Sequence, residues 1–150
     1  MLRNVLIVDD DLNFLDSMRR TLRQKQEEWD ISFSSNALTG LDILKDKGPT
    51  VVVTDWNMPR MDGMEFCRHI REREDKTELQ NCYIILLTGN LGVEKAVEAL
   101  EQGADDFLNK PCDPRELIAR INVGFRIIEL QDDLRRANQQ LEVFARSMVE

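Results

Sequence analysis

The sequence predicts an α/β fold in which helices wind around both faces of a five-stranded parallel sheet, followed by an extended C-terminal helix. Three observations carry this prediction. Short apolar runs alternate with amphipathic helical patterns five times along the 150 residues, which is the order of elements in a doubly wound sheet. The strongest runs are apolar without interruption, as in strands buried on both faces. The last helical pattern continues far beyond the length that one small domain needs.

The strands are expected where apolar residues cluster between polar or turn-forming residues. The first run, residues 5–8, reads Val-Leu-Ile-Val and stands directly before three aspartates. The others follow at residues 31–34, 51–53, 83–87 and 106–108. The second and fifth are weaker because polar residues interrupt them. Runs this short between turn residues favour buried strands, since helices need longer patterns.

Helices are expected between the strands because apolar residues recur there at intervals of three and four. These patterns cover residues 12–22, 37–44, 64–70 and 93–100. Asn36 or Ser35 is a suitable N-cap for the second helix. The charged segment 71–76 is expected to be a solvated surface. Residues 113–116, Asp-Pro-Arg-Glu, open the last helix with a capping Asp, a first-turn Pro and a Glu in the capping-box position.

Composition excludes several classes of function. The 28 Asp and Glu residues exceed the 20 Lys and Arg residues, and the net charge of −8 argues against direct nucleic-acid binding by this chain. No segment approaches the roughly 20 apolar residues that span a membrane. The three cysteines are widely spaced without a CxxC pair, so we expect reduced thiols and a cytoplasmic location rather than disulfides or zinc.

Polar residues gather just after the predicted strands. In a doubly wound sheet these positions share the edge where ligands bind. Asp9, Asp10 and Asp11 follow the first strand, and Asp55 follows the third. Asp11 suits an N-cap of the following helix. The other carboxylates would repel one another, so Lys110 after the fifth strand and a hard divalent cation such as Mg²⁺ are expected to offset their charge.

Four motifs at these strand ends resemble the receiver domain of two-component response regulators, the family of the chemotaxis regulator. They are the acidic pair at residues 8–10, the segment Thr-Asp-Trp-Asn-Met-Pro-Arg-Met-Asp-Gly at 54–63, Thr-Gly at 88–89, and Gly-Ala-Asp-Asp-Phe-Leu-Asn-Lys-Pro at 103–111. The resemblance runs from about residue 4 to about residue 124 and implies a flavodoxin-like fold.

The resemblance also implies a site chemistry. Asp55 would accept a phosphoryl group from a sensor histidine kinase in a reaction that needs Mg²⁺, for which Mn²⁺ can substitute. Asp10, Asp55 and the backbone carbonyl of Asn57 would hold the ion, and Asp9 would act largely through bound water. The domain would catalyse only its own phosphorylation and dephosphorylation.

The resemblance also implies that other residues contact the phosphoryl group or change conformation in response to it. Lys110 and the Thr88 hydroxyl would each contact a phosphoryl oxygen, and Gly89 with Asn57 would leave access to the acceptor. The Lys110–Pro111 peptide bond is expected to be cis. Thr88 and Phe107 would form the conformational switch, although Phe107 fits a plain core residue equally well.

Two other functions compete with the signalling switch. A magnesium-dependent phosphatase of the haloacid dehalogenase kind also uses an Asp nucleophile, but it needs a second Asp two residues later. Asn57 occupies that position and cannot transfer the proton. A scaffold that only mediates pairing would not require the set of site residues that this sequence retains, namely Asp9, Asp10, Asp55, Thr88 and Lys110.

The last helix divides the chain into a receiver at residues 1–124 and a helical extension at 125–150, with Gly124 as a kink or joint. The extension carries an a/d heptad seam, formed by Ile127, Leu130, Leu134, Ala137, Leu141, Phe144 and Met148. We expect a parallel coiled-coil homodimer; the alternatives are a helix that folds back on its domain or frays as a linker. The chain is either a stand-alone regulator or the N-terminal part of a longer one with an enzymatic output, such as a diguanylate cyclase or protein phosphatase.

Overall fold

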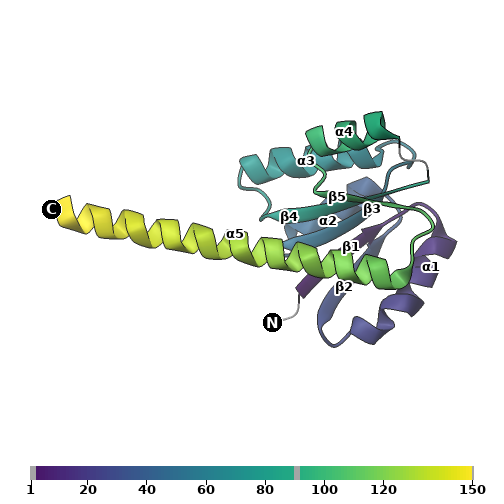
Figure 1. Cartoon of the computed structure of the whole chain (residues 1–150), viewed down its shortest axis with the longest axis horizontal. Coiled ribbons are helices and arrows are strands. Elements are labelled where there is room, and N and C mark those ends of the chain that lie inside the picture. Colours follow the sequence, from purple (N-terminus) through teal and green to yellow (C-terminus); the bar gives the residue numbers. More distant parts are fainter. Residues whose placement is uncertain (1–2, 90–91, 150) are drawn as a thin grey trace.

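The computed structural model describes residues 3–89 and 92–149 and contains one five-stranded parallel sheet (Figure 1). The strands are β1 (Arg3–Val8), β2 (Trp29–Ser34), β3 (Thr50–Asp55), β4 (Cys82–Thr88) and β5 (Asp106–Asn109). Their order across the sheet is β2-β1-β3-β4-β5. The chain therefore reverses its direction of travel between β1 and β3, and the predicted doubly wound sheet is confirmed.

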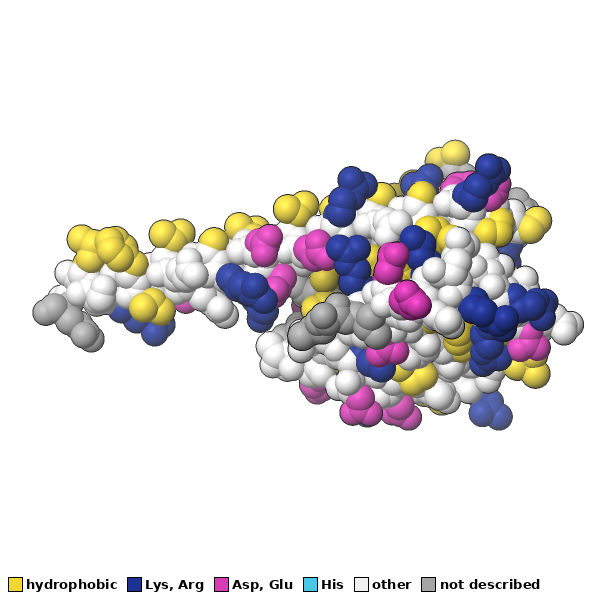
Figure 2. Space-filling model, turned by 90° about the horizontal axis from the view of Figure 1, so that it is seen from below, with side chains coloured by type: hydrophobic (Ala, Val, Ile, Leu, Met, Phe, Trp, Pro, Cys, Tyr) yellow, Lys and Arg dark blue, Asp and Glu magenta, His cyan; other side chains and the backbone are white. Residues whose placement is uncertain are grey.

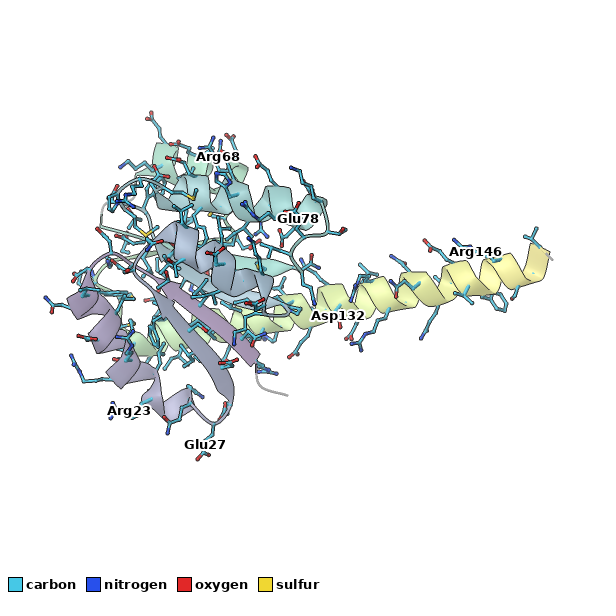
Figure 3. The ribbon with its side chains drawn as sticks, turned by 180° about the vertical axis from the view of Figure 1, so that it is seen from behind. Arg23, Glu27, Arg68, Glu78, Asp132 and Arg146 are labelled. Carbon is cyan, nitrogen blue, oxygen red and sulfur yellow. The ribbon has the colours of Figure 1, made fainter. Side chains whose placement is uncertain are left out.

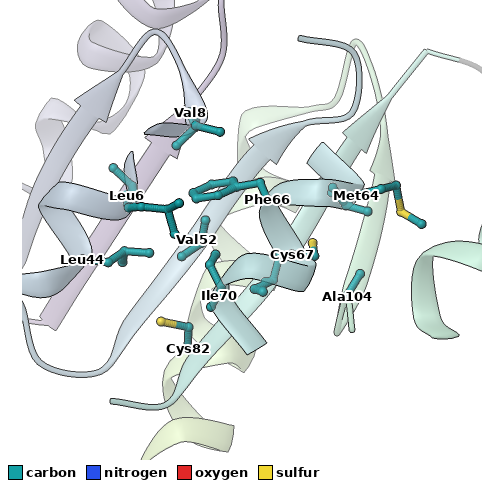
Figure 4. Close-up of a cluster of buried hydrophobic side chains, with 14 of the residues drawn as sticks. Leu6, Val8, Leu44, Val52, Met64, Phe66, Cys67, Ile70, Cys82 and Ala104 are labelled. Carbon is teal, nitrogen blue, oxygen red and sulfur yellow. The ribbon is translucent and has the colours of Figure 1, made fainter. Parts of the chain in front are cut away.

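Helices cover both faces of the sheet. Their bounds are α1 (Leu12–Thr21), the short 3-10 helix η1 (Leu22–Lys25), α2 (Ala37–Lys45), α3 (Gly63–Asp75), α4 (Val93–Glu101) and α5 (Pro114–Val149). One buried cluster joins α2, α3 and Ala99 of α4 to one face of the sheet. A second cluster joins α1 and α5 to the other face. Figure 4 shows the first cluster, in which Phe66 and Ile70 of α3 point toward Leu6 and Val52.

The sheet register brings three strand ends level. Val8 of β1 lies opposite Thr54 of β3, and Thr88 of β4 lies opposite Asn109 of β5. The residues that follow β1 and β5, and the last residue of β3, therefore meet at one edge. Two caps start the helices that leave this edge: Asp11 for α1 and Asn36, one of the two expected residues, for α2.

The charged segment 71–76 is not simply a solvated surface, and this expectation was wrong for two of its members. The Arg71 guanidinium donates to Glu74 at 2.7 Å and Asp105 at 2.5 Å, and also to the carbonyls of Cys82 and Gly103, both at 2.9 Å. The Arg71 and Glu74 side chains are only 27% and 12% exposed. We call Arg71, Glu74 and Asp105 the arginine clamp; it joins α3 to the amino ends of β4 and β5.

Helix α5 runs unbroken through Gly124, so the prediction of a kink or joint there was wrong. A Cβ at Gly124 would lie 2.7 Å from the Tyr83 ring and 2.9 Å from Val51. The helix thus packs on the sheet at this glycine too closely to leave room for a side chain. Phe125 and Ile128, which follow it, are buried in the same core cluster.

Beyond Glu129, which forms an ion pair with Arg3 at 2.9 Å, the helix leaves the domain and projects into solvent (Figure 1). Its 36 residues correspond to about 54 Å of helix. The space-filling view in Figure 2 shows hydrophobic side chains in a row along the projecting part. Arg146 is exposed near the end of the projecting part (Figure 3), whereas Asp132, closer to the domain, is only partly exposed. The last residue of the expected extension, Glu150, and residues 1–2 of the expected receiver lie outside the described ranges. Within these ranges, no helix is long and apolar enough to cross a membrane.

Candidate functional site

Backbone hydrogen bonds fix the three strand ends that carry the predicted site. The amide of Asp9 donates to the Ser34 carbonyl at 3.1 Å, which continues the pairing of β1 with β2. The amide of Trp56 donates to Leu87 at 2.9 Å and so holds the residue after Asp55 against β4. The amide of Lys110 donates to the Thr88 carbonyl at 2.8 Å.

Asp9, Asp10 and Asp55 converge at this edge. One carboxylate oxygen from each lies within 4.8 Å of the other two. Asp9 is completely buried, Asp55 is 14% exposed at its side chain, and Asp10 is open to solvent. Among the described residues this is the one cluster of acidic, His or Cys side chains with the spacing of a metal site.

Lys110 is the cation of the site. Its Nζ donates to Asp9 Oδ2 at 2.5 Å and lies 3.7 Å from Asp55 Oδ1. The other Asp9 oxygen accepts the backbone amide of Asp11 at 2.9 Å. Three carboxylates around one ammonium leave two surplus negative charges. Repulsion between like charges at this spacing amounts to a few kcal/mol at the edge of a protein, so the arrangement favours binding of a divalent cation.

Burial and neighbouring charge both act on Asp55. Burial is the larger cause and raises the pKa of the Asp55 carboxyl, and the Asp9 carboxylate raises this pKa further, whereas Lys110 lowers it. A cation bound between the carboxylates would oppose this rise, because it favours the ionised form. The oxygen ligands, the partial burial and the solvent-facing Asp10 together suit Mg²⁺, which prefers one or two carboxylates and retains several waters.

The remaining predicted residues surround the cluster. Thr88 is buried at the end of β4, and Asn57 is exposed two residues beyond Asp55. A Cβ at Gly89 would meet no heavy atom within 4 Å, so the space beside it is open. Phe107 is partly buried against the α2–α3 core cluster, which fits either a core residue or a switch. The Lys110–Pro111 peptide bond is cis.

The structure adds one residue that the sequence did not single out. The ring centroid of Phe14, in the first turn of α1, lies 4.2 Å from Lys110 Nζ. Phe14 reads as an ordinary apolar residue in an amphipathic helix. Its partner is 96 positions away, and only the fold brings the two together.

Comparison with known proteins agrees with this geometry. The sequence model of the response regulator receiver domain matches residues 5–122. The response regulator MprA of Mycobacterium ulcerans is 34% identical over 129 residues, covering 86% of this chain and 53% of MprA. The chain thus spans about half the length of the curated relatives it matches.

Two solved structures extend the comparison. A structure described as adenylate cyclase from Rhodopirellula baltica has a TM-score of 0.79 at 27% identity, with 93% of this chain and 98% of that chain covered. A two-component system response regulator/GGDEF domain protein has a TM-score of 0.68 at 31% identity, with 85% of this chain and 50% of that chain covered.

Proposed function

The chain belongs to the family of response regulator receiver domains, and from this premise we propose that Asp55 is its phosphoryl acceptor. Receiver domains of two-component systems take a phosphoryl group onto an aspartate in a reaction that depends on Mg²⁺. Response regulators receive that group from sensor histidine kinases. The observation that carries the assignment is the surplus negative charge around one lysine at the edge of the sheet.

In the proposed transfer, an Asp55 carboxylate oxygen forms a bond to phosphorus as the phosphorus–nitrogen bond of a phosphohistidine breaks. Asp9, Asp10 and Asp55, with the backbone carbonyl of Asn57, would hold Mg²⁺, which supplies positive charge that offsets the charge on the acceptor and the donor. Mn²⁺ can take the same oxygen ligands. We assign Asp9 mainly to holding Lys110 and ordering the site, in line with its buried ion pair.

Residues around Asp55 would then stabilise the transferred group. Lys110 Nζ, 3.7 Å from Asp55 Oδ1, is close enough to contact a phosphoryl oxygen after a small shift. The Thr88 hydroxyl would contact another phosphoryl oxygen. Thr88 and Phe107 would form the conformational switch that transmits phosphorylation to β4 and β5. The open space at Gly89 supports access of the donor to Asp55. By this assignment the chain catalyses only its own phosphorylation and dephosphorylation.

The acceptor assignment can be tested with a small phosphodonor. The protein is incubated with acetyl phosphate and Mg²⁺, and its intact mass is measured under acid and after brief base treatment. We expect an acid-stable, base-labile phosphoryl adduct in the wild type and in the control variant Asp42→Asn, whose side chain is exposed on α2. The adduct should be absent from Asp55→Asn; its persistence there would remove the assignment.

We also propose that the helical extension, residues 125–150, forms a parallel coiled-coil homodimer. Phe125 and Ile128 pack on the receiver, whereas Leu130, Leu134 and Leu141 of the seam are each more than half exposed. An exposed apolar row of this length favours a partner with the same row. Residue 124 would then separate the signalling part of the chain from the dimerising part, although the first residues of the extension, Phe125 and Ile128, still pack on the receiver.

Sedimentation analysis across concentration tests the dimer. Leu134→Asp combined with Leu141→Asp should shift the mass to that of a monomer. The matched control is Val143→Asp, which also introduces an acid at an exposed apolar residue of the helix but lies off the seam. A monomeric wild type at high concentration would contradict the proposal.

A second candidate is that this chain is the N-terminal part of a longer regulator with an enzymatic output, such as a diguanylate cyclase or protein phosphatase. Its coverage of about half of MprA and of the GGDEF-containing protein favours this reading. We also propose a cytoplasmic location, which the wide spacing of the three cysteines along the sequence supports. Sequencing the gene in its genomic context would decide between the two forms.

A further inference from the structure

Among the residues that the structure describes, two carboxylates and one uncharged ring are paired with the Lys110 ammonium. The two charged groups are the carboxylates of Asp9 and Asp55, whose Oδ2 and Oδ1 atoms lie 2.5 and 3.7 Å from Lys110 Nζ. The Phe14 ring lies against it, with its centroid 4.2 Å away. This distance is well inside the range of about 6 Å over which a cation interacts with the negative face of an aromatic ring.

The fold holds the ring in this place. The Asp11 side chain caps α1 by accepting the backbone amides of Asn13 and Phe14, at 3.0 and 3.3 Å. The cap fixes the first turn of the helix and therefore the direction of the Phe14 side chain. Phe14 is partly buried and packs against the core cluster of α1 and α5, and this packing holds its ring in position beside Lys110.

The ring and the carboxylates respond differently when the site is loaded. A divalent cation held by the three carboxylates would compete with Lys110 for Asp9 and Asp55, and its charge would repel the ammonium. A lysine side chain has four rotatable bonds and can leave such a site. The aromatic ring offers no ligand to the metal and keeps its attraction for the ammonium in every charge state of the acids.

We propose that Phe14 is a positioning residue that keeps the Lys110 ammonium beside Asp55 when metal and phosphoryl donor occupy the acidic site. This inference rests on the proposed role of Lys110 in phosphoryl transfer and adds a residue that acts through it. It predicts that phosphorylation depends on the electrostatic potential of the ring face as well as on its volume.

The test replaces Phe14 with Leu, with Tyr, and with phenylalanines carrying one, two or three ring fluorines, which progressively weaken the negative ring face at nearly constant shape. The rate of phosphorylation by acetyl phosphate is measured at saturating Mg²⁺ over a range of donor concentrations, together with the thermal midpoint. We expect Phe14→Leu to lower the donor-saturated rate constant about 3- to 10-fold. Phe14→Tyr should retain the rate, and the fluorinated proteins should fall in order of fluorine number.

Wild-type rates in Phe14→Leu and in the fluorinated proteins, or rates that follow the thermal midpoint instead of the fluorine number, would overturn the inference.

NMR gives a second readout that needs no turnover. The ε-methylene protons of Lys110 should be shifted upfield by the ring in the Mg²⁺-loaded wild type and return toward ordinary values in Phe14→Leu; ordinary values in the wild type would refute the contact. Asp55→Asn is run in parallel. An adduct there defeats the proposed acceptor, whereas its absence beside an unaffected Phe14→Leu defeats only the role of Phe14.

Discussion

Two ionic clusters lie at opposite ends of the sheet, and they differ in how their carboxylates are compensated. In the arginine clamp, at the amino ends of β4 and β5, Glu74 and Asp105 share the Arg71 guanidinium. Each of these acids also accepts a backbone amide, from Cys82 at 2.7 Å and from Ile84 at 2.8 Å. At the carboxyl end of the sheet, Asp9 and Asp55 share the ammonium of Lys110, and the carboxylate of Asp10 lies beside them without an ion pair to this lysine among those of the described residues.

The difference separates a structural role from a functional one. Charge-assisted hydrogen bonds that satisfy both partners, as in the clamp, hold elements in place. Surplus charge of one sign destabilises the fold, and such a cluster is typical of a site that binds an ion or carries out chemistry. Both clusters are ionic, so the number of charged residues alone would not distinguish them.

Breaking the clamp should give the largest change in stability. Arg71→Met leaves two acids without their cation, and we expect a loss of about 3 kcal/mol in the free energy of unfolding, seen by thermal or urea denaturation. The control is Arg68→Met, an exposed position on the same helix (Figure 3), which should change little. The comparison of the two clusters fails if Arg71→Met keeps its stability or if the folded variant no longer forms the phosphoryl adduct.

Adding Mg²⁺ should act on the other cluster. Binding to the folded state alone stabilises it by about 2.7 kcal/mol at one hundred times the dissociation constant. We expect this increment in the wild type, in Asp42→Asn and in Arg71→Met, and a much smaller one in Asp10→Asn and Asp55→Asn. Calorimetric melting with and without Mg²⁺ measures it. Equal increments in all five proteins would place the ion elsewhere.

Asp55→Asn should have the smallest effect on stability, and a favourable one. The pKa of Asp55 is raised in the folded state, mainly by burial and then by Asp9. The folded protein thus holds this proton more tightly than the unfolded chain, and stability is lost as the pH rises above the ordinary value of 3.8 through the folded pKa. Without metal, the variant should exceed the wild type by on the order of 1 kcal/mol at neutral pH.

The pH dependence provides the check. In the presence of a chelator, the difference in unfolding free energy between Asp55→Asn and the wild type should be near zero in acid and grow as the pH rises toward neutrality. A difference that is constant with pH would mean that the effect comes from packing and not from the charge of Asp55.

The central strands could be predicted because buried parallel strands leave continuous apolar runs, as at residues 5–8 and 83–87, and the two weaker edge strands followed from the alternation with helical patterns. The convergence of Asp9, Asp10 and Asp55 could be predicted too, since parallel strands end at a common edge. Both inferences depend only on local pattern and on the topology that such patterns permit.

The features that escaped prediction depend on tertiary contact. Arg71 and Glu74 stand in a charged segment, and nothing in that segment indicates that Asp105 will meet them. Gly124 suggests a flexible joint in sequence, but the Tyr83 ring beside it shows that the missing side chain allows close packing. Phe14 follows the helical pattern, and only the return of the chain at β5 brings Lys110 to its ring.

Peptide mapping can locate the phosphoryl group itself on the chain. The protein is phosphorylated with acetyl phosphate and Mg²⁺, reduced with borohydride, which converts an aspartyl phosphate to homoserine, and mapped by peptide mass spectrometry. We expect homoserine at position 55 and at no other aspartate, with none when Mg²⁺ is withheld. Homoserine at Asp9 or Asp10, or a phosphoryl adduct that leaves Asp55 unreduced, would contradict the assignment of Asp55 as the acceptor.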